Sequence, residues 1–237
     1  MPARPAGSDL PDQLEGVGVL AEPARRSLYE YVVRRAEPVS REQAAEEVGI
    51  PVHSVKFHLD KLAAAGLLEV EYRRVSGRTG PGAGRPSKLY RRSAREVSLS
   101  VPPRRYDLAG EVMAEAIDRA DRDGVPVREA VSLVAQEVGR QIAEVDAPEP
   151  AKPGGGASGE LERTGTVLER HGYQPEVVDE ELCLANCPFD RLAGDHTPLV
   201  CGMNLALVDG VLEGLGATTV RARLAPHEGF CCVRVGR

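Results

Sequence analysis

Residues 51–72 carry the clearest hydrophobic pattern in the chain. Val55, Leu59 and Leu62 recur at the i, i+4, i+7 spacing that places side chains on one face of a helix. Gly66 interrupts this pattern, and the run LLEVEY that follows has the length and apolar content of a strand. The stretch therefore predicts an amphipathic helix followed by a strand.

Another helix is expected immediately before this one. Ser40 and Gln43 have the spacing of a capping box, and Gly49 suits the end of the helix that they open. Pro51 can start the next helix, because a residue in the first turn needs no N–H donor. A further apolar pattern predicts a bracing helix over residues 22–35.

The segment after the strand is strongly basic. Residues 73–95 contain eight Lys or Arg residues and no Asp or Glu. The middle of this span, SGRTGPGAGRP, is too rich in glycine and proline for a helix or a central strand. A basic run can be no more than a solvated face, but the absence of acidic residues favours DNA as the partner.

A short helix pair followed by a basic two-stranded flap resembles the winged helix-turn-helix of ArsR- and MarR-type bacterial regulators. In that fold the second helix enters the major groove, and the wing lies on phosphate or in the minor groove. The resemblance implies a double-stranded DNA operator as the partner. The residues expected to contact DNA are His53, Ser54, Lys56 and His58 on the helix, and Arg78, Arg85 and Lys88 on the wing.

Length and charge indicate two different parts. The 237 residues suit about two domains. Residues 1–105 hold 18 basic and 13 acidic residues, whereas residues 106–237 hold 12 and 23. This asymmetry suits a nucleic-acid module joined to a domain that stays off DNA. No apolar run of about 18 residues and no secretory signal is found, so a cytoplasmic protein without membrane contact is expected.

The pattern as a whole predicts an α+β protein with an N-terminal winged helix-turn-helix, a central helix hairpin and a C-terminal α+β sensor domain that contains the cysteines. The hairpin is a natural dimer seam, because helix-turn-helix proteins usually read paired half-sites, so a homodimer is expected. The expected boundaries are a flexible N-terminus at 1–12, a DNA-binding domain at 13–95, a helical connector at 96–146, a flexible linker at 147–159 and the sensor domain at 160–237.

All five cysteines fall in the last 55 residues, at Cys183, Cys187, Cys201, Cys231 and Cys232. Stable disulfides are rare in the cytoplasm, so clustered cysteines there indicate metal or redox chemistry. Iron–sulfur clusters are held by thiolates, and a proline often follows a ligating cysteine, as Pro188 follows Cys187.

The motifs NCPF, VCGMN and GFCCV around these cysteines, with GRP and LY in the wing, resemble winged-helix iron–sulfur regulators of the Suf-repressor type and their actinobacterial relatives. The resemblance extends from about residue 20 to the end. It implies a 4Fe–4S or 2Fe–2S cluster held by Cys187, Cys201 and one cysteine of the final pair, with Cys231 favoured.

The residues themselves leave alternatives open for the ligand set. Neighbours on a strand point to opposite faces, so only one of Cys231 and Cys232 is expected to reach the site of Cys187 readily. The fourth ligand could be Cys183, if the segment before Cys187 is helical. It could also be His196 or an external thiol.

Other chemistries compete with the cluster. Zinc could bind Cys187, His196, Cys201 and Cys231, although only one short pair of cysteines occurs here and zinc sites usually contain such pairs. A thiol switch without a cluster and a purely structural role as small core side chains are further alternatives. An enzyme is not expected, because Cys187 with Asp195 and His196 lacks a third orienting group and an oxyanion loop.

Overall fold

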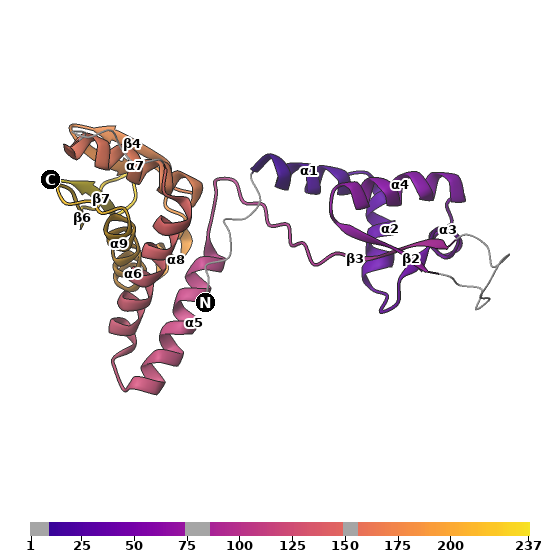
Figure 1. Cartoon of the computed structure of the whole chain (residues 1–237), viewed down its shortest axis with the longest axis horizontal. Helices are drawn as coiled ribbons and strands as arrows, with labels where there is room; N and C mark the ends of the chain where they lie inside the picture. Colours follow the sequence, from indigo (N-terminus) through magenta and orange to yellow (C-terminus); the bar gives the residue numbers. More distant parts are fainter. Residues whose placement is uncertain (1–9, 74–85, 149–155) are drawn as a thin grey trace. The chain divides into compact units, whose positions relative to one another are not determined.

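The computed structural model describes residues 10–73, 86–148 and 156–237 (Figure 1). The chain divides into two compact units, one built on Gly7–Leu99 and the other on Ser100–Arg237. Helices and strands occur in both, which confirms the predicted mixture of α and β structure. Among the described residues, no helix combines the length and the apolar composition that crossing a membrane requires.

The N-terminal unit consists of helices around a small antiparallel sheet, in which β3 lies between β1 and β2 (Figure 1). The helix pair and the following strand agree with the sequence pattern, whereas α1 is not predicted by it. The elements of this unit are α1 (Leu10–Leu20), α2 (Pro23–Val33), β1 (Val39–Ser40), α3 (Arg41–Val48), α4 (Val52–Ala64), β2 (Leu68–Arg73) and β3 (Ser87–Arg92).

Local capping explains where α3 begins and ends. The Ser40 hydroxyl accepts a hydrogen bond from the Gln43 N–H at 3.2 Å, and the Gln43 side chain accepts one from the Ser40 N–H at 2.9 Å. Gly49 ends the helix with a φ of 73°, a left-handed conformation that glycine adopts without steric cost. The predicted capping box and stop signal are both confirmed.

The periodic apolar residues of α4 form the core of this unit. Val55, Leu59 and Leu62 are fully buried, and they belong to one cluster with Leu28 and Val32 of α2. Burying a side chain of this size stabilises the fold by about 1.5–3 kcal/mol relative to exposing it. The apolar face of α4 is therefore fixed against α2, whereas His53 and Lys56 on the rest of the helix are exposed.

The C-terminal unit contains a second antiparallel sheet with the order β4-β5-β7-β6, and both α7 and α9 contact it. The structure adds α8, which the sequence pattern does not predict, and it begins α7 at Gly156, inside the span expected to be a linker. The elements are α5 (Tyr106–Asp123), α6 (Val127–Asp146), α7 (Gly156–Arg170), β4 (Pro175–Val178), β5 (Glu181–Leu184), α8 (Asp190–Asp195), α9 (Thr197–Gly214), β6 (Arg221–Leu224) and β7 (Val233–Gly236).

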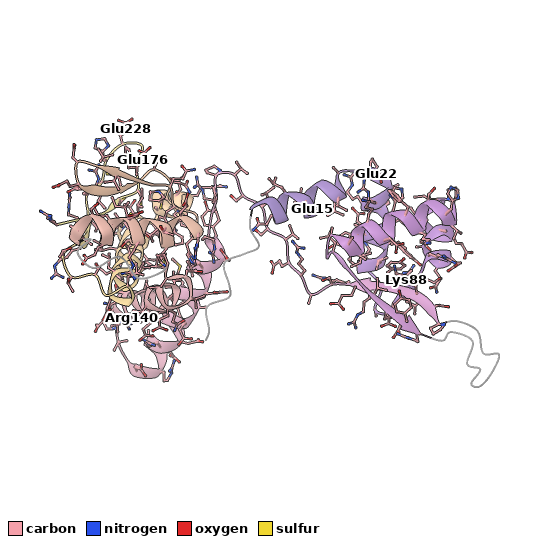
Figure 2. All side chains as sticks on the ribbon, turned by 45° about the horizontal axis from the view of Figure 1, so that its top comes forward. Glu15, Glu22, Lys88, Arg140, Glu176 and Glu228 are labelled. Carbon is pink, nitrogen blue, oxygen red and sulfur yellow. The ribbon has the colours of Figure 1, made fainter. Side chains whose placement is uncertain are left out.

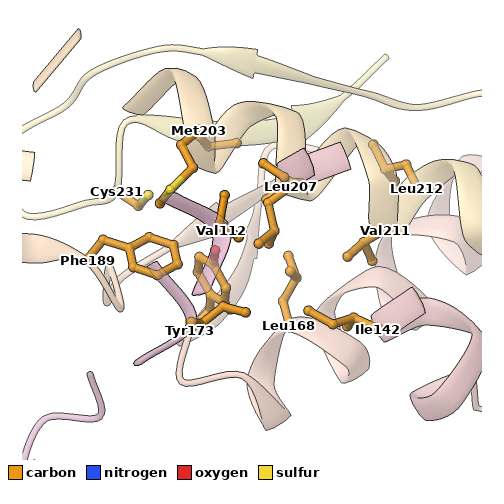
Figure 3. Close-up of a cluster of buried hydrophobic side chains, with 14 of the residues drawn as sticks. Val112, Ile142, Leu168, Tyr173, Phe189, Met203, Leu207, Val211, Leu212 and Cys231 are labelled. Carbon is orange, nitrogen blue, oxygen red and sulfur yellow. The ribbon is translucent and has the colours of Figure 1, made fainter. Parts of the chain in front are cut away.

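A single hydrophobic core joins the helices of this unit to its sheet. Figure 3 shows part of it, with side chains of α6 and α9 beside Tyr173 and Phe189, and with Cys231 in the same group. With no tryptophan in the chain, aliphatic side chains supply most of this core. The cysteine at its edge is thus positioned by packing that extends through the whole unit.

Helices α6 and α9 cross at very short range. A Cβ atom on Gly139 of α6 would overlap the carbonyl oxygen of Leu207, and one on Gly210 of α9 would overlap the carbonyl oxygen of Gln136. Glycine is required at both positions because backbone faces backbone. The crossing fixes α9, and therefore the cysteine that α9 carries, to α6.

We predict that Gly139→Ala destabilises the C-terminal unit by about 1–3 kcal/mol, because the added methyl group forces the two helices apart. Hydrogen exchange of peptides from α6 and α9 measures the effect. Gly202→Ala in α9 is the matched control, since nothing lies within 4 Å of its added Cβ and alanine favours a helix. Equal exchange in the two variants would contradict the close crossing.

Candidate functional site

The first two turns of α4 present the residues predicted to read DNA. His53 and Lys56 are exposed and Ser54 is half-buried, whereas Val55 between them is fully buried. This division follows from the helical period, because residues three or four positions apart share a face. Phe57, an aromatic residue that the sequence pattern does not single out, is exposed on the same side of α4.

The structure places His58 differently from the expectation. Its side chain is only 16% exposed, and its Nδ1 lies 3.6 Å from a carboxylate oxygen of Glu22. Glu22 also caps α2 by accepting hydrogen bonds from the N–H groups of Ala24 and Arg25, and the Arg25 bond holds the pKa of this carboxyl below its ordinary value. His58 therefore contacts the N-terminal end of α2 at the edge of the buried face.

Lys88 of β3, labelled in Figure 2, is held by α4. Its ammonium group pairs with Asp60 of α4, and the Tyr90 hydroxyl donates to the same carboxylate oxygen at 2.7 Å. Burial alone would raise the pKa of Asp60, but these two hydrogen bonds outweigh it and lower that pKa. Asp60 thus ties β3 to α4, and it brings Lys88 to the face of α4 that also carries Lys56.

Acidic residues outside the basic span neutralise part of it. Arg91 pairs with Glu69 on the neighbouring strand, and Arg73 pairs with Glu71 and Glu37. The positive charge of this span is therefore partly offset in the folded unit, although the span itself contains no acidic residue. Arg78 and Arg85, the two wing residues predicted to touch phosphate, lie outside the described residues.

The second candidate site gathers four of the five cysteines in the C-terminal unit. Cys187 follows β5, Cys201 lies in α9, and Cys231 and Cys232 come just before β7. We call these four residues the four-thiol group. Three separate segments of the chain supply it, so it exists only when the unit is folded.

The thiols of the four-thiol group act on one another's pKa values in pairs. The bond with the Cys231 thiol holds the pKa of Cys187 below its ordinary value, against the effect of burial. The same bond raises the pKa of Cys231 far above its ordinary value. Burial and a hydrogen bond with Cys232 raise the pKa of Cys201 to about 12, and the charge of Cys187 adds to this shift in pKa.

A buried amide orients one of these thiols. The Asn204 side chain in α9 donates a hydrogen bond to the Cys231 sulfur at 3.1 Å, and its oxygen accepts one from the Tyr173 hydroxyl. Asn204 and Tyr173 are each 2% exposed, so neither can exchange this partner for water. Both residues are missed by the sequence pattern, where a polar residue inside an apolar helix is the only signal.

The final cysteine pair directs its two thiols to different partners. Strand β7 begins at Val233, but backbone hydrogen bonds from the Cys231 N–H to the Leu184 carbonyl, at 2.8 Å, and from the Ala225 N–H to the Cys232 carbonyl, at 2.7 Å, continue the pairing with its neighbours. Cys231 meets Cys187, whereas Cys232 meets Cys201.

Cys183 and His196 are the two other candidates for the fourth ligand. Cys183 is buried in β5 opposite Glu176, and the strand removes the helical route by which it was expected to approach Cys187. His196 is exposed at the N-terminal end of α9. Across the described parts of the chain, no three His, Cys, Asp or Glu side chains surround a point where a single metal ion would fit. The thiols are paired rather than gathered around one centre.

Comparison with known proteins bears on the first of these sites. Residues 20–71 match the model of a helix-turn-helix domain family, which points to a DNA-binding transcription regulator. The match covers α2, α3, α4 and most of β2. Neither curated proteins nor solved structures gave a match.

We predict that Asp60→Ala lowers the free energy of unfolding of the N-terminal unit by about 1–3 kcal/mol, because the buried Tyr90 hydroxyl loses its acceptor. Urea unfolding and hydrogen exchange of β3 measure this. Asp60→Asn keeps an acceptor for Tyr90 and should lose clearly less. If both substitutions have the same effect, the Tyr90 hydrogen bond is not what holds the strand.

Proposed function

We propose that this protein is a transcription regulator that binds a DNA operator as a homodimer and holds an iron–sulfur cluster in its C-terminal unit, through which it responds to redox or iron–sulfur status. The helix-turn-helix match at residues 20–71 is the observation that supports DNA binding. The exposed N-terminal turns of α4, with His53 and Lys56 turned to solvent, support it, because that end of the recognition helix contacts base edges.

The four-thiol group supports the second part. Thiolates are the ligands that iron–sulfur clusters require, and hydrogen bonds to their sulfur atoms tune such sites. Asn204 supplies one of these bonds to Cys231, and the Phe189 N–H supplies another to Cys187. When bound, a cluster would provide a centre whose charge changes on oxidation or loss, and the thiols of Cys187, Cys201, Cys231 and Cys232 would hold it.

The paired arrangement distinguishes between the alternatives. A zinc ion draws four ligands to one centre at about 2.0–2.3 Å, whereas a cluster distributes its thiolates over several iron atoms. Two linked pairs of thiols suit a cluster better than a zinc ion. A thiol switch without a cluster remains the second candidate, because Cys187, with its lowered pKa, lies against the thiol of Cys231.

A homodimer is supported by the outer side of α5. Tyr106 and Ile117 are 38% and 56% exposed, and Met113 between them is half-buried. These positions are seven and four residues apart, so they follow one stripe along the helix. An apolar stripe on a long helix suits a seam between two copies, which would present two recognition helices to paired half-sites.

DNA binding is tested by selecting duplexes from a random pool with the full chain. We predict two-fold symmetric sequences whose binding weakens with salt, with a logarithmic slope of about −0.9 for each phosphate contact. Lys56→Ala should relax the preference at one position, at a cost of about 1–3 kcal/mol if a base contact is lost. Arg122→Ala in α5 removes an exposed positive charge from the other unit and should change nothing. Selection of no common sequence would refute the regulator.

The cluster is tested by five single Cys→Ser variants, purified without oxygen and assayed for iron, sulfide and visible absorbance. We predict that substitution of Cys187, Cys201 or Cys231 removes the absorbance, because each of these variants lacks a thiolate that the proposed cluster needs, and that loss of Cys232 weakens it. Cys183→Ser is the buried control and should keep it. Intact absorbance without Cys187 or Cys201 would refute the ligand set, and zinc without sulfide in the wild type would establish the zinc alternative.

A further inference from the structure

We infer that Phe57 of α4 reads the methyl group of a thymine in the major groove and so determines part of the operator sequence. This inference rests on the proposed function, because it requires α4 to enter DNA. It starts from one observation, which is that a large aromatic side chain is 57% exposed on a helix whose other face is fully packed.

Phe57 stands apart from the other phenylalanines of the chain. The sequence contains only three, and Phe189 is fully buried while Phe230 is half-buried against His227. Phe57 belongs to neither hydrophobic core. Leaving most of a phenyl ring in water forgoes burial that would be worth about 1.5–3 kcal/mol, so the ring contributes little to folding.

The position of Phe57 indicates the charge of the partner that its ring contacts. It lies one helical turn after His53 and beside Lys56, on the side of α4 opposite Val55 and Leu59. Its ring packs edge-on against His58 at 5.5 Å between centroids, and the Lys61 ammonium lies 6.0 Å from its centre. The nearby carboxylate of Asp60 is paired with Lys88. Lys56 and Lys61 therefore leave the surface around the ring positively charged, which suits the approach of an anion.

The chemistry of the major groove supplies a matching group. Thymine is the only base that presents a methyl group there, and an apolar side chain discriminates for it by contact. A phenyl ring makes no hydrogen bond to a base edge, so the other base pairs offer it nothing comparable. The flanking polar residues of α4 can bond to base edges or phosphate while Phe57 covers the methyl group.

Uracil tests the inference without changing the protein, because it pairs as thymine does and lacks only the methyl group. The probes are the duplex that the wild-type chain selects from a random pool and its copies with each thymine replaced singly by uracil. Fluorescence anisotropy measures their affinities. At one position in each half-site, uracil should weaken binding about fourfold, the ratio that burial of one methyl-sized group supplies.

Phe57→Ala should bind the thymine and uracil duplexes equally at that position, and Phe57→Leu should keep part of the discrimination. Tyr72→Ala is the matched control, because Tyr72 is an aromatic residue of the same unit, 64% exposed but on β2. It should keep the fourfold ratio. Circular dichroism of all three variants should match the wild type.

Two failures are distinguishable. A wild-type chain that selects no duplex refutes the proposed function itself. A chain that selects a duplex but binds every uracil copy as tightly as the original refutes only the role of Phe57. If Phe57→Ala keeps the fourfold ratio, another residue makes the methyl contact and the inference is wrong. The inference is also wrong if Phe57→Ala changes the oligomeric state while the ratio stays the same.

Discussion

The backbones of α6 and α9 meet at Gly139 and Gly210, where a methyl group on either residue would overlap a facing carbonyl oxygen. No side chain separates the two helices at this point, so neither can shift along the other without backbone collision. Interiors packed to this density respond to strain by moving as units. The rest of the C-terminal unit takes its arrangement from this crossing, because α9 also contacts β6, β7, α7 and α8.

The crossing would transmit a change at the four-thiol group to the other helices of the C-terminal unit. Helix α9 carries Cys201 in the group and Asn204 in the hydrogen bond to Cys231. A change in the bonding of these sulfur atoms would bear directly on α9, and through the glycine contact on α6. Helix α6 packs in turn against α5, which carries the exposed apolar stripe. Coupling of this kind is a shift between two packings, each stabilised by its own contacts.

In the N-terminal unit, a single carboxylate joins a helix to a strand. Asp60 of α4 holds both Lys88 and Tyr90 of β3, so helix and strand are joined on the side of α4 that also carries Lys56, one helical turn earlier. An acidic residue on a DNA-reading helix would ordinarily repel phosphate, and its pairing with Lys88 offsets that charge. The one acidic side chain of α4 is therefore paired with a lysine on the face that it shares with Lys56.

Local signals in the sequence were sufficient for the helix-turn-helix, because the cap at Ser40, the stop at Gly49 and the spacing of Val55 and Leu59 act over a few residues. Partners distant in sequence were not predictable from spacing. Lys88 looked like a free basic residue because Asp60 lies 28 residues away in the chain.

The cysteines show the same limit. Their grouping in the last 55 residues was visible in the sequence, but the pairing was not. Spacing predicts that Cys231 and Cys232 differ in their partners, but it does not identify Cys201 as the partner of Cys232. Asn204 gave no signal beyond its polarity, since its bonds to Tyr173 and Cys231 depend on the tertiary fold.

The central claim is that occupancy of the four-thiol group changes the affinity of the helix-turn-helix for DNA. The most direct test measures the affinity of one anaerobic preparation of the full chain for its selected duplex, before and after iron is removed with a chelator, with iron and sulfide assayed in each sample. We expect the two dissociation constants to differ by at least about fivefold, the lower range of coupling between two sites. Equal constants for the loaded and the iron-free chain would contradict the claim.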